Sequence, residues 1–537
     1  MSRFLPLIIF VLWMASPDGA QPGYNINPGE GMATFFGFYI ALVLIMGLWS
    51  RHVARRVHFG DIQNRLRRFN QLMGFARLMI PTWFGVGIYL LGWKTLVMQG
   101  FAQTPLGGLR LDTPGILIGS LPAFLAWMGL WWAQYPADFA LREQNLLIQL
   151  NESLPVHQPP GFWSYFGVNF RLQLLFSIAP ILVLLALRDI LGLVLPPIFH
   201  QISWLRDQQS LIEATISVPS AGAILLLGPE ILRRVLDTEP LPDSPLRRRL
   251  EDLCRQHNVG FHEVLLWKTR HQMGNAAVMG FVPRFRYFLM SDLLLETMSD
   301  EQIEAVFAHE IGHIKHKHLF WLLASVAGLM LGMAGPGSII VDAMEHLHQH
   351  MWLPETLQMI ILMGGGLAIF ALFFGYVSRK FERQADVFAA RTLQAAYDAA
   401  ISASALSATG TEGASAVAVF PRLAFAPPHQ TAEQSFVGRY GAQIFCSALE
   451  RVATVNNIPI AARSWCHGSI ARRMRFLFDL GRDPRRTFVF DSFMSKLYIS
   501  LILILCLFGA WTMVNLYSDK TFSNVSTSAN AAIQIQR

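Results

Sequence analysis

Long apolar runs separated by short polar loops recur along the chain. A transmembrane helix needs about 20 mainly apolar residues. Eight runs approach this length, and we predict that they are Phe35–Trp49, Leu78–Met98, Ile116–Trp132, Leu172–Leu187, Ile216–Leu232, Leu319–Val341, Leu357–Val377 and Leu497–Leu516. The pattern therefore predicts a mainly α-helical, multi-pass transmembrane bundle of about eight spans.

The composition fits this prediction and explains the positive charge. Hydrophobic residues make up 53% of the chain and charged residues only 15%, whereas a soluble protein carries about a quarter charged residues. The net charge of +7 comes from arginines and lysines in alternate loops, which include Arg51, Arg55, Arg56, Arg233, Arg234, Arg379, Lys380 and Arg383. The positive-inside rule places these loops in the cytoplasm. The charge is thus a topology signal, and no nucleic-acid partner is expected.

Residues 1–20 allow two interpretations. Arg3 precedes the apolar stretch Phe4–Ala15, as in a secretory signal peptide, although Asp18 is unfavourable near a cleavage site. The alternative is an uncleaved extra span. Either places the segment before the first span outside and the arginine-rich loop after Trp49 inside.

Between the spans lie two substantial polar segments, residues 233–318 and 378–496. Counting crossings places both in the cytoplasm, so we expect them to meet as two halves of one α+β catalytic domain, split by the transmembrane hairpin 319–377. Short strands are predicted at Val264–Thr269 and Tyr287–Met290. A helix is predicted to start after Ser299, capped together with Gln302, and to run directly into the membrane. The remaining chain comprises spans one to five within 33–232, the last span at 497–516 and a polar tail at 517–537.

The motif His309-Glu310-Ile311-Gly312-His313 lies on this predicted helix. Residues four apart project from one helix face, so the two imidazoles can bind one zinc ion. Zinc lowers the pKa of bound water to about 7. Glu310 would accept the proton of that water and then donate it to the leaving amine. The alternative is a basic juxtamembrane helix, because His316, Lys317 and His318 follow immediately.

A second motif follows the seventh span at residues 378–386, which read SRKFERQAD. A catalytic zinc site with two histidines needs a third protein ligand, and Glu382 lies on the same side of the membrane to supply it. Asp386, one turn later, could accept a hydrogen bond from a ligand histidine and fix its tautomer. The alternative is an amphipathic helix whose charges pair in solvent.

Together the two motifs resemble those of the integral-membrane zinc peptidases that comprise the CAAX prenyl endopeptidases and the HtpX-like heat-shock proteases. The resemblance implies a zincin-like catalytic domain with one Zn²⁺ per chain, held by His309, His313 and Glu382. It also covers Asn275-Ala276. That segment would lie on an edge strand beside the cleft, with Asn275 binding the substrate backbone by strand addition.

A further match surrounds His467 and Arg473. The resemblance implies that His467 stabilises the oxyanion and that Arg473 pairs with Asp386. Here Gly468 stands where the family usually has proline, which loosens the backbone next to His467. The resemblance spans Leu172–Leu480. The last span has no counterpart in the usual seven-span plan.

Other polar residues of the sequence are weaker candidates for a functional site. His346, His348 and His350 form a cluster that the predicted topology places across the membrane from Glu310, as an interfacial loop. Three charged residues lie in or beside apolar spans, where ionisable groups are often functional. Arg188 and Asp189 would mark a helix end, and Lys94 would either snorkel or line a cavity.

The sequence therefore predicts a membrane-embedded zinc metalloendopeptidase that cleaves membrane or membrane-proximal polypeptides, either misfolded membrane proteins or lipidated peptides. We expect a bacterial inner membrane with a cytoplasmic active site, or the endoplasmic reticulum membrane in a eukaryote. The alternatives are a non-proteolytic transporter and an inactive zinc-binding scaffold. A site-2-type protease is disfavoured because its aspartate ligand lies within a span, and Leu357–Val377 contains no carboxylate.

Overall fold

The fold was analysed in a computed structural model. It describes residues 5–16, 27–56, 62–105, 111–151, 158–199, 209–334, 337, 355–408, 436–456 and 458–535. The chain divides into two compact units. The first comprises Met1–Asp243 with Gly260–Thr297, and the second comprises Ser244–Val259 with Met298–Arg537. His346, His348 and His350 lie outside the described residues.

Helices form most of the first unit. They are α1 (Leu5–Ala15), α2 (Pro28–Arg56), α3 (Ile62–Tyr89), α4 (Trp93–Ala102), α5 (Asp112–Asn151), α6 (Phe162–Asn169), the π-helical turn η2 (Phe170–Leu175), α7 (Phe176–Phe199) and α8 (Gln209–Val235). Their core is aromatic, with Phe35, Phe84, Trp127 and Trp131 fully buried. Large rings bury much apolar area and so stabilise packing between helices.

The predicted span Leu78–Met98 is wrong as a single helix. The helix α3 ends at Tyr89, and α4 begins only at Trp93. Gly92 between them has a φ of 71°, a left-handed conformation that glycine adopts readily and that ends a helix. The hydrophobic pattern alone does not reveal this break.

Five helical stretches of the described chain are long and apolar enough to cross a membrane. They are Pro28–Arg56, Arg68–Tyr89, Asp112–Gln144, Phe162–Leu195 and Pro484–Asn515, with a shorter apolar helix at His318–Met333. The predicted spans Ile216–Leu232 and Leu357–Val377 lie within the longer helices α8 and α14. Several helices of the described chain could therefore span a membrane, and the total of eight spans stays a prediction.

The helix α1 packs into the core of the first unit. Ile9 and Phe10 are fully buried, and Trp13 stacks on Phe84 with ring centroids 6.3 Å apart. The buried Nζ of Lys94 donates to the carbonyls of Trp13 at 3.1 Å and Ser16 at 2.5 Å. A cation at a helix C-terminus is favourable, so Lys94 holds the end of α1. Cleavage after residue 20 would remove this helix, and both interpretations of residues 1–20 stay predictions.

The first unit also contains a four-stranded sheet. Its strands β1 (Thr238–Pro240), β2 (Glu263–Trp267), β3 (Ala276–Met279) and β4 (Tyr287–Ser291) lie in the order β1-β2-β4-β3. The pair β2–β4 is parallel and the other two pairs are antiparallel. The 3₁₀ turn η3 (Pro283–Phe285) precedes β4, and α10 (Asp292–Thr297) follows it. The two predicted strands correspond to β2 and β4.

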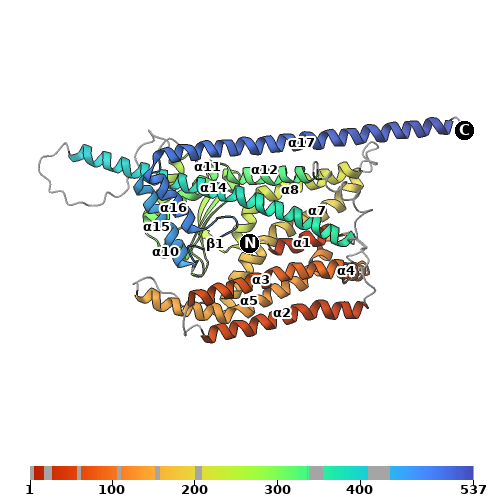
Figure 1. The fold of residues 1–537 in the computed structure, drawn as a ribbon, viewed down its shortest axis with the longest axis horizontal. Coiled ribbons are helices and arrows are strands. Elements are labelled where there is room, and N and C mark those ends of the chain that lie inside the picture. Colours follow the sequence, from red (N-terminus) through yellow and green to blue (C-terminus); the bar gives the residue numbers. More distant parts are fainter. Residues whose placement is uncertain are drawn as a thin grey trace. The chain divides into compact units, whose positions relative to one another are not determined.

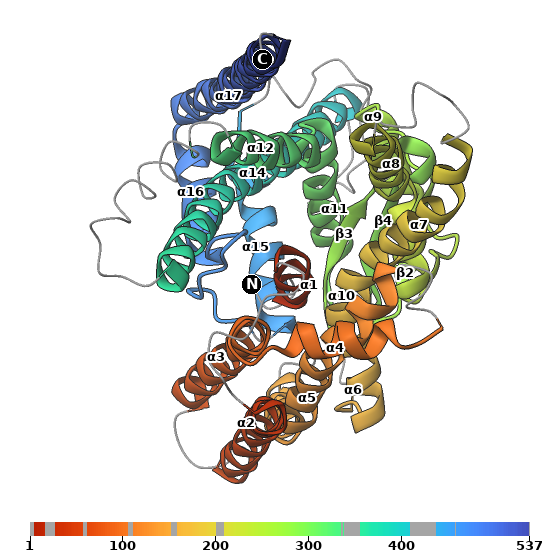
Figure 2. The ribbon, with the colours of Figure 1, turned by 90° about the vertical axis from the view of Figure 1, so that its right-hand side faces the viewer.

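The second unit is helical in its described part. Its helices are α9 (Pro245–Gln256), α11 (Asp300–Lys315), α12 (His318–Ala334), α14 (Glu355–Ala408), α15 (Arg439–Val455), α16 (Ile470–Arg482) and α17 (Pro484–Ile535). The helices α12 and α14 pack together, and α17 runs alongside α12 (Figures 1 and 2). The last helix continues through most of the predicted polar tail.

The start of α11 is as predicted, but its end is not. Ser299 caps the helix and forms a capping box with Gln302. The expected continuous run into the membrane is wrong, because α11 ends at Lys315 and α12 begins at His318. Lys317 between them has a φ of 53°, outside the helical region. The turn changes the direction of the chain directly after the metal motif.

Candidate metal centre

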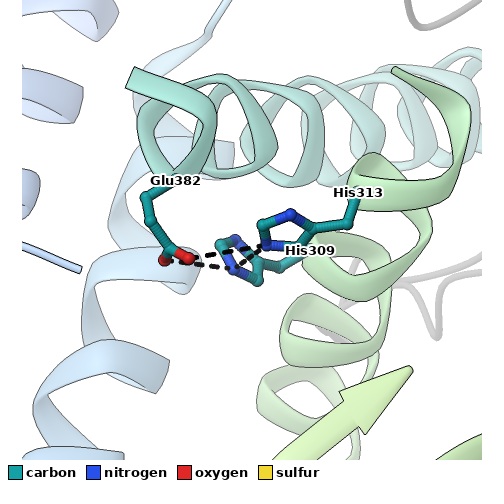
Figure 3. A group of neighbouring side chains, drawn as sticks. All are labelled: His309, His313 and Glu382. Carbon is teal, nitrogen blue, oxygen red and sulfur yellow. Dashed lines mark hydrogen bonds and ion pairs between the residues drawn. The ribbon is translucent and has the colours of Figure 1, made fainter. Parts of the chain in front are cut away.

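The helices α11 and α14 come into close contact where their two motifs face each other. Gly312 makes this possible, since a Cβ atom at this position would lie 3.1 Å from Cα of Ala385 and 3.2 Å from Cβ of Phe388. A larger side chain would push the helices apart. The contact brings His309 and His313 on α11 next to Glu382 on α14 (Figure 3).

The three predicted ligands converge. The Nε2 atoms of His309 and His313 are 3.2 Å apart. The two carboxylate oxygens of Glu382 each lie 3.8 Å from one of these nitrogens (Figure 3). All three ligand atoms lie within 4.8 Å of one another, and no other such group of three side chains is found in the described part of the chain.

This donor set fits zinc. Tetrahedral Zn²⁺ with bonds of about 2.0–2.2 Å separates its ligand atoms by roughly 3.3 Å. The distance between the histidine nitrogens is close to this value, and the carboxylate is slightly farther away. Two imidazoles and one carboxylate also form a donor set common in catalytic zinc sites.

Asp386 and Arg473 form the far side of His309. Oδ1 of Asp386 lies 3.0 Å from Nδ1 of His309. Arg473 on α16 donates two hydrogen bonds to Asp386, at 2.8 Å and 2.5 Å. Its Nη1 also lies 3.4 Å from Glu382. The structure thus brings together the two residues that the resemblance pairs.

These contacts set the charges of the two buried carboxyl groups. Burial raises the pKa of Glu382, but a hydrogen bond from His467 and the charge of Arg473 outweigh it and hold the pKa well below its ordinary value. Burial also raises the pKa of Asp386, and Arg473 and His309 together lower it below its ordinary value. Both groups are therefore carboxylates at neutral pH.

The two histidines differ in their proton affinity. Burial lowers the pKa of His309, but Asp386 and then Glu382 outweigh it and raise the pKa above its ordinary value. Burial and the neighbouring His309 lower the pKa of His313 to about 3. His309 therefore binds a proton more readily than His313 does.

Glu310 lies between the two histidines on α11 and is half-buried. The pKa of Arg473 is raised against the effect of burial, chiefly by Asp386 and then by Glu382 and Glu310. The charge of Glu310 therefore acts on the same guanidinium as the carboxylates of the site.

His467 lies in a turn anchored on α14. Ser464 and Gly468 pair their backbones, and Gly468 has a φ of 75°. The proline usual in the family could not adopt this conformation, since its φ is fixed near −65°. The indole of Trp465 donates to the carbonyl of Ala371 at 2.7 Å. Nδ1 of His467 lies 2.9 Å from Oε1 of Glu382, with 63% of the side chain exposed. The glycine thus shapes the turn that brings His467 to the site.

The sequence interpretation gave His318 no role in the metal site and named it only in the alternative of a basic juxtamembrane helix. His318 is buried, and its Nδ1 lies 2.9 Å from Nδ1 of His313. The side chain reaches back to α11 only because the chain turns at Lys317. No helical spacing predicts this contact.

The other candidates lie in the first unit. Asn275 directly precedes the edge strand β3, and its backbone carbonyl accepts a hydrogen bond from the amide of Ser291 at 3.0 Å. The edge position agrees with the expectation, and its role in substrate binding stays a prediction. Asp189 accepts a hydrogen bond from the amide of Thr113 at the start of α5, at 2.9 Å. Arg188 lies 3.4 Å from Asp112. The expectation that Arg188 and Asp189 mark a helix end is wrong, because both lie inside α7 and contact the start of α5.

Known proteins match the part of the chain that carries these motifs. The profile of Peptidase family M48 matches residues 240–454, which include His309, Glu310, His313, Glu382 and Asp386. A CAAX prenyl protease 1 homolog of Oryza sativa subsp. japonica is 30% identical over 163 residues, which are 28% of this chain and 37% of that protein. The Arabidopsis thaliana homolog is 29% identical over 159 residues, 28% of this chain and 38% of that protein.

The alignments thus span little more than a third of the length of these relatives. A crystal structure of S. mikatae Ste24p aligns over 85% of this chain and 99% of that chain, with 13% identity and a TM-score of 0.39. The domain match and the two plant relatives agree with the resemblance of the two motifs. Residues 240–454 of this chain are therefore similar to Peptidase family M48, and its plant relatives are CAAX prenyl protease 1 homologs.

Proposed function

We propose that this protein is a membrane-embedded zinc metalloendopeptidase that hydrolyses peptide bonds of membrane or membrane-proximal polypeptides. One observation carries the proposal: His309, His313 and Glu382 bring three zinc-compatible ligand atoms within 4.8 Å of one another. Glu310, in the same motif, provides a carboxylate beside them.

Each residue of the metal centre has its own role in the proposed peptide hydrolysis. His309, His313 and Glu382 hold one Zn²⁺, which when bound acts as a Lewis acid and makes hydroxide available near neutral pH. Glu310 accepts the proton of the attacking water and returns it to the leaving amine. His467, exposed beside Glu382, donates a hydrogen bond to the oxyanion of the tetrahedral intermediate.

Asp386 and Arg473 orient His309 in this proposal. With its proton on Nδ1, facing Asp386, His309 presents the lone pair of Nε2 to the metal. The two hydrogen bonds from Arg473 fix the carboxylate of Asp386 in place. A planar guanidinium suits such paired contacts with a carboxylate.

The substrate is proposed to be a polypeptide that adds a strand to the edge strand β3, which begins directly after Asn275. The names of the plant relatives indicate prenylated protein substrates for those proteins. A lipidated peptide and a misfolded membrane protein are both candidates here, and cleavage of matched prenylated and unprenylated peptides distinguishes them. We place the active site on the cytoplasmic face of a bacterial inner membrane, or of the endoplasmic reticulum in a eukaryote.

The transporter alternative has less support. It requires charged groups at membrane depth that are available to a passing ion. Lys94 instead binds the end of α1, and Asp189 binds the start of α5. An inactive zinc-binding scaffold remains the alternative, and the following variant distinguishes it from an enzyme.

Glu310→Gln should keep about one zinc per chain and lose peptidase activity by about 10²–10⁴-fold, because the amide cannot accept the water's proton. Metal analysis and cleavage of an unfolded protein substrate measure the two effects. Glu301→Gln, an exposed position on the same helix, is the matched control and should behave as wild type. Full activity in Glu310→Gln would refute the proposed mechanism.

Asp386→Asn should weaken zinc binding by about 10–100-fold, the usual effect of losing a partner of a ligand histidine. The amide keeps the size of the side chain but removes the charge that fixes His309. Chelator competition measures the affinity. Asp398→Asn, exposed on the same helix, should change nothing. Equal affinities in the two variants would show that Asp386 has no role in holding the metal.

Zinc affinity should fall as the pH falls below the raised pKa of His309. A raised pKa means that the proton competes with Zn²⁺ in mildly acidic solution, so binding releases about one proton there. His313, with a pKa of about 3, contributes nothing above about pH 4. Chelator competition between pH 8 and pH 5 tests this. An affinity independent of pH, or a release of two protons, would contradict the assignment.

A further inference from the structure

His313 has a partner on its far side that differs in kind from the partner of His309. The turn at Lys317 brings His318, the first residue of α12, back toward α11. Its ring is buried and stacks on Phe381 of α14, with centroids 4.6 Å apart and planes 4° apart. In this position its Nδ1 lies 2.9 Å from Nδ1 of His313. The ring has one well-defined orientation, so its second nitrogen also has a fixed direction.

The second nitrogen of His318, Nε2, is connected to the last helix through Gln384. Nε2 of His318 lies 3.0 Å from Oε1 of the buried Gln384 on α14. The hydroxyl of Tyr498 on α17 donates to the same oxygen at 2.6 Å. The ring of Tyr498 packs against Trp321 at 4.8 Å and Phe381 at 5.8 Å. Four side chains from four helices thus form one continuous chain of contacts, which starts at a metal ligand and ends at α17.

The hydrogen bonds between these four side chains all run in one direction. The amide oxygen of Gln384 only accepts, so His318 must donate from Nε2. A neutral imidazole with its proton on Nε2 accepts at Nδ1. His313 therefore donates from Nδ1, and its Nε2 is left as a lone pair. This is the nitrogen that faces His309 and Glu382 in the candidate metal site.

The hydroxyl of Tyr498 stabilises this direction by its hydrogen bond to the amide oxygen of Gln384. If Gln384 rotated by half a turn, its NH₂ group would face His318, the hydroxyl of Tyr498 would accept instead of donate, and every hydrogen bond between these side chains would reverse. His313 would then carry its proton on Nε2, the form that cannot bind a metal. The structure contains the orientation in which Tyr498 donates, and this hydrogen bond contributes to the stability of that orientation.

We propose that His318, Gln384 and Tyr498 are positioning residues that hold His313 in its metal-binding tautomer. The helix α17, which the seven-span plan of the family does not require, thereby contributes directly to the metal site. The inference rests on the proposed function, because it takes His313 as a zinc ligand. His309 is held by the charged pair Asp386 and Arg473, whereas His313 is held by a chain of neutral groups.

Tyr498→Phe removes only the hydroxyl and should weaken zinc binding by about 3–10-fold, somewhat less than loss of a direct partner. His318→Phe keeps the stacked ring but removes both nitrogens, and should weaken binding by about 10–100-fold. Chelator competition on the purified full-length protein at pH 8 measures both. Tyr440→Phe in the same unit, whose ring stacks on Tyr397, is the control and should bind zinc as wild type does.

A rescue separates positioning from general packing. A carboxylate can only accept a hydrogen bond, so Gln384→Glu fixes the proton on Nε2 of His318 without help from Tyr498. The double variant Tyr498→Phe with Gln384→Glu should regain most of the lost affinity. The melting temperature of the zinc-free protein should be nearly the same in Tyr498→Phe and wild type, whereas a purely structural role would lower it.

Several results would overturn the inference. They are unchanged zinc affinity in Tyr498→Phe, an equal loss in Tyr440→Phe, or no recovery in the double variant. The zinc content of the wild-type protein tests the proposed function separately. Absence of zinc from the wild-type protein would refute that function, whereas normal zinc binding with no effect of Tyr498→Phe refutes only the role of α17.

Discussion

The close contact between α11 and α14 at Gly312 is the constraint on which the site depends. A Cβ atom at Gly312 would lie only 3.1 Å from Cα of Ala385, so glycine allows the two helices to approach without a tight contact. The contact fixes the relative rotation of the two helices, and so it determines which face of α14 meets the histidines. Glu382 and Asp386 lie one helical turn apart on that face. One of them therefore meets the metal-binding side of His309, and the other meets its far side.

Burial of charge gives this arrangement its chemical character. Two buried carboxylates, Glu382 and Asp386, face one buried guanidinium, Arg473. The excess negative charge favours a cation in the site, since an uncompensated buried charge is costly. The same negative charge favours a proton on His309, whose pKa is raised above its ordinary value. A divalent ion balances the same charge, and this makes proton and metal alternative occupants.

Much of the site follows from local spacing, and the rest does not. The i,i+4 pairs in both motifs and the cap at Ser299 depend on helix geometry that the sequence states directly. The contact of His318 with His313 depends on a positive φ at Lys317, and the position of His467 depends on one at Gly468. Gly92 divides a predicted span for the same reason. Apolar patterns carry no information about such single backbone conformations, nor about which residue of the last helix meets Gln384.

The central claim is that α11 and α14 jointly form one zinc site, and the ligand on α14 tests it most directly. Zinc content and affinity should be measured in the wild-type protein and in Glu382→Gln, which keeps the size of the side chain and removes its charge. The account predicts about one zinc per wild-type chain and an affinity at least about 100-fold weaker in the variant, as expected for loss of a charged ligand. Wild-type affinity in Glu382→Gln would contradict it.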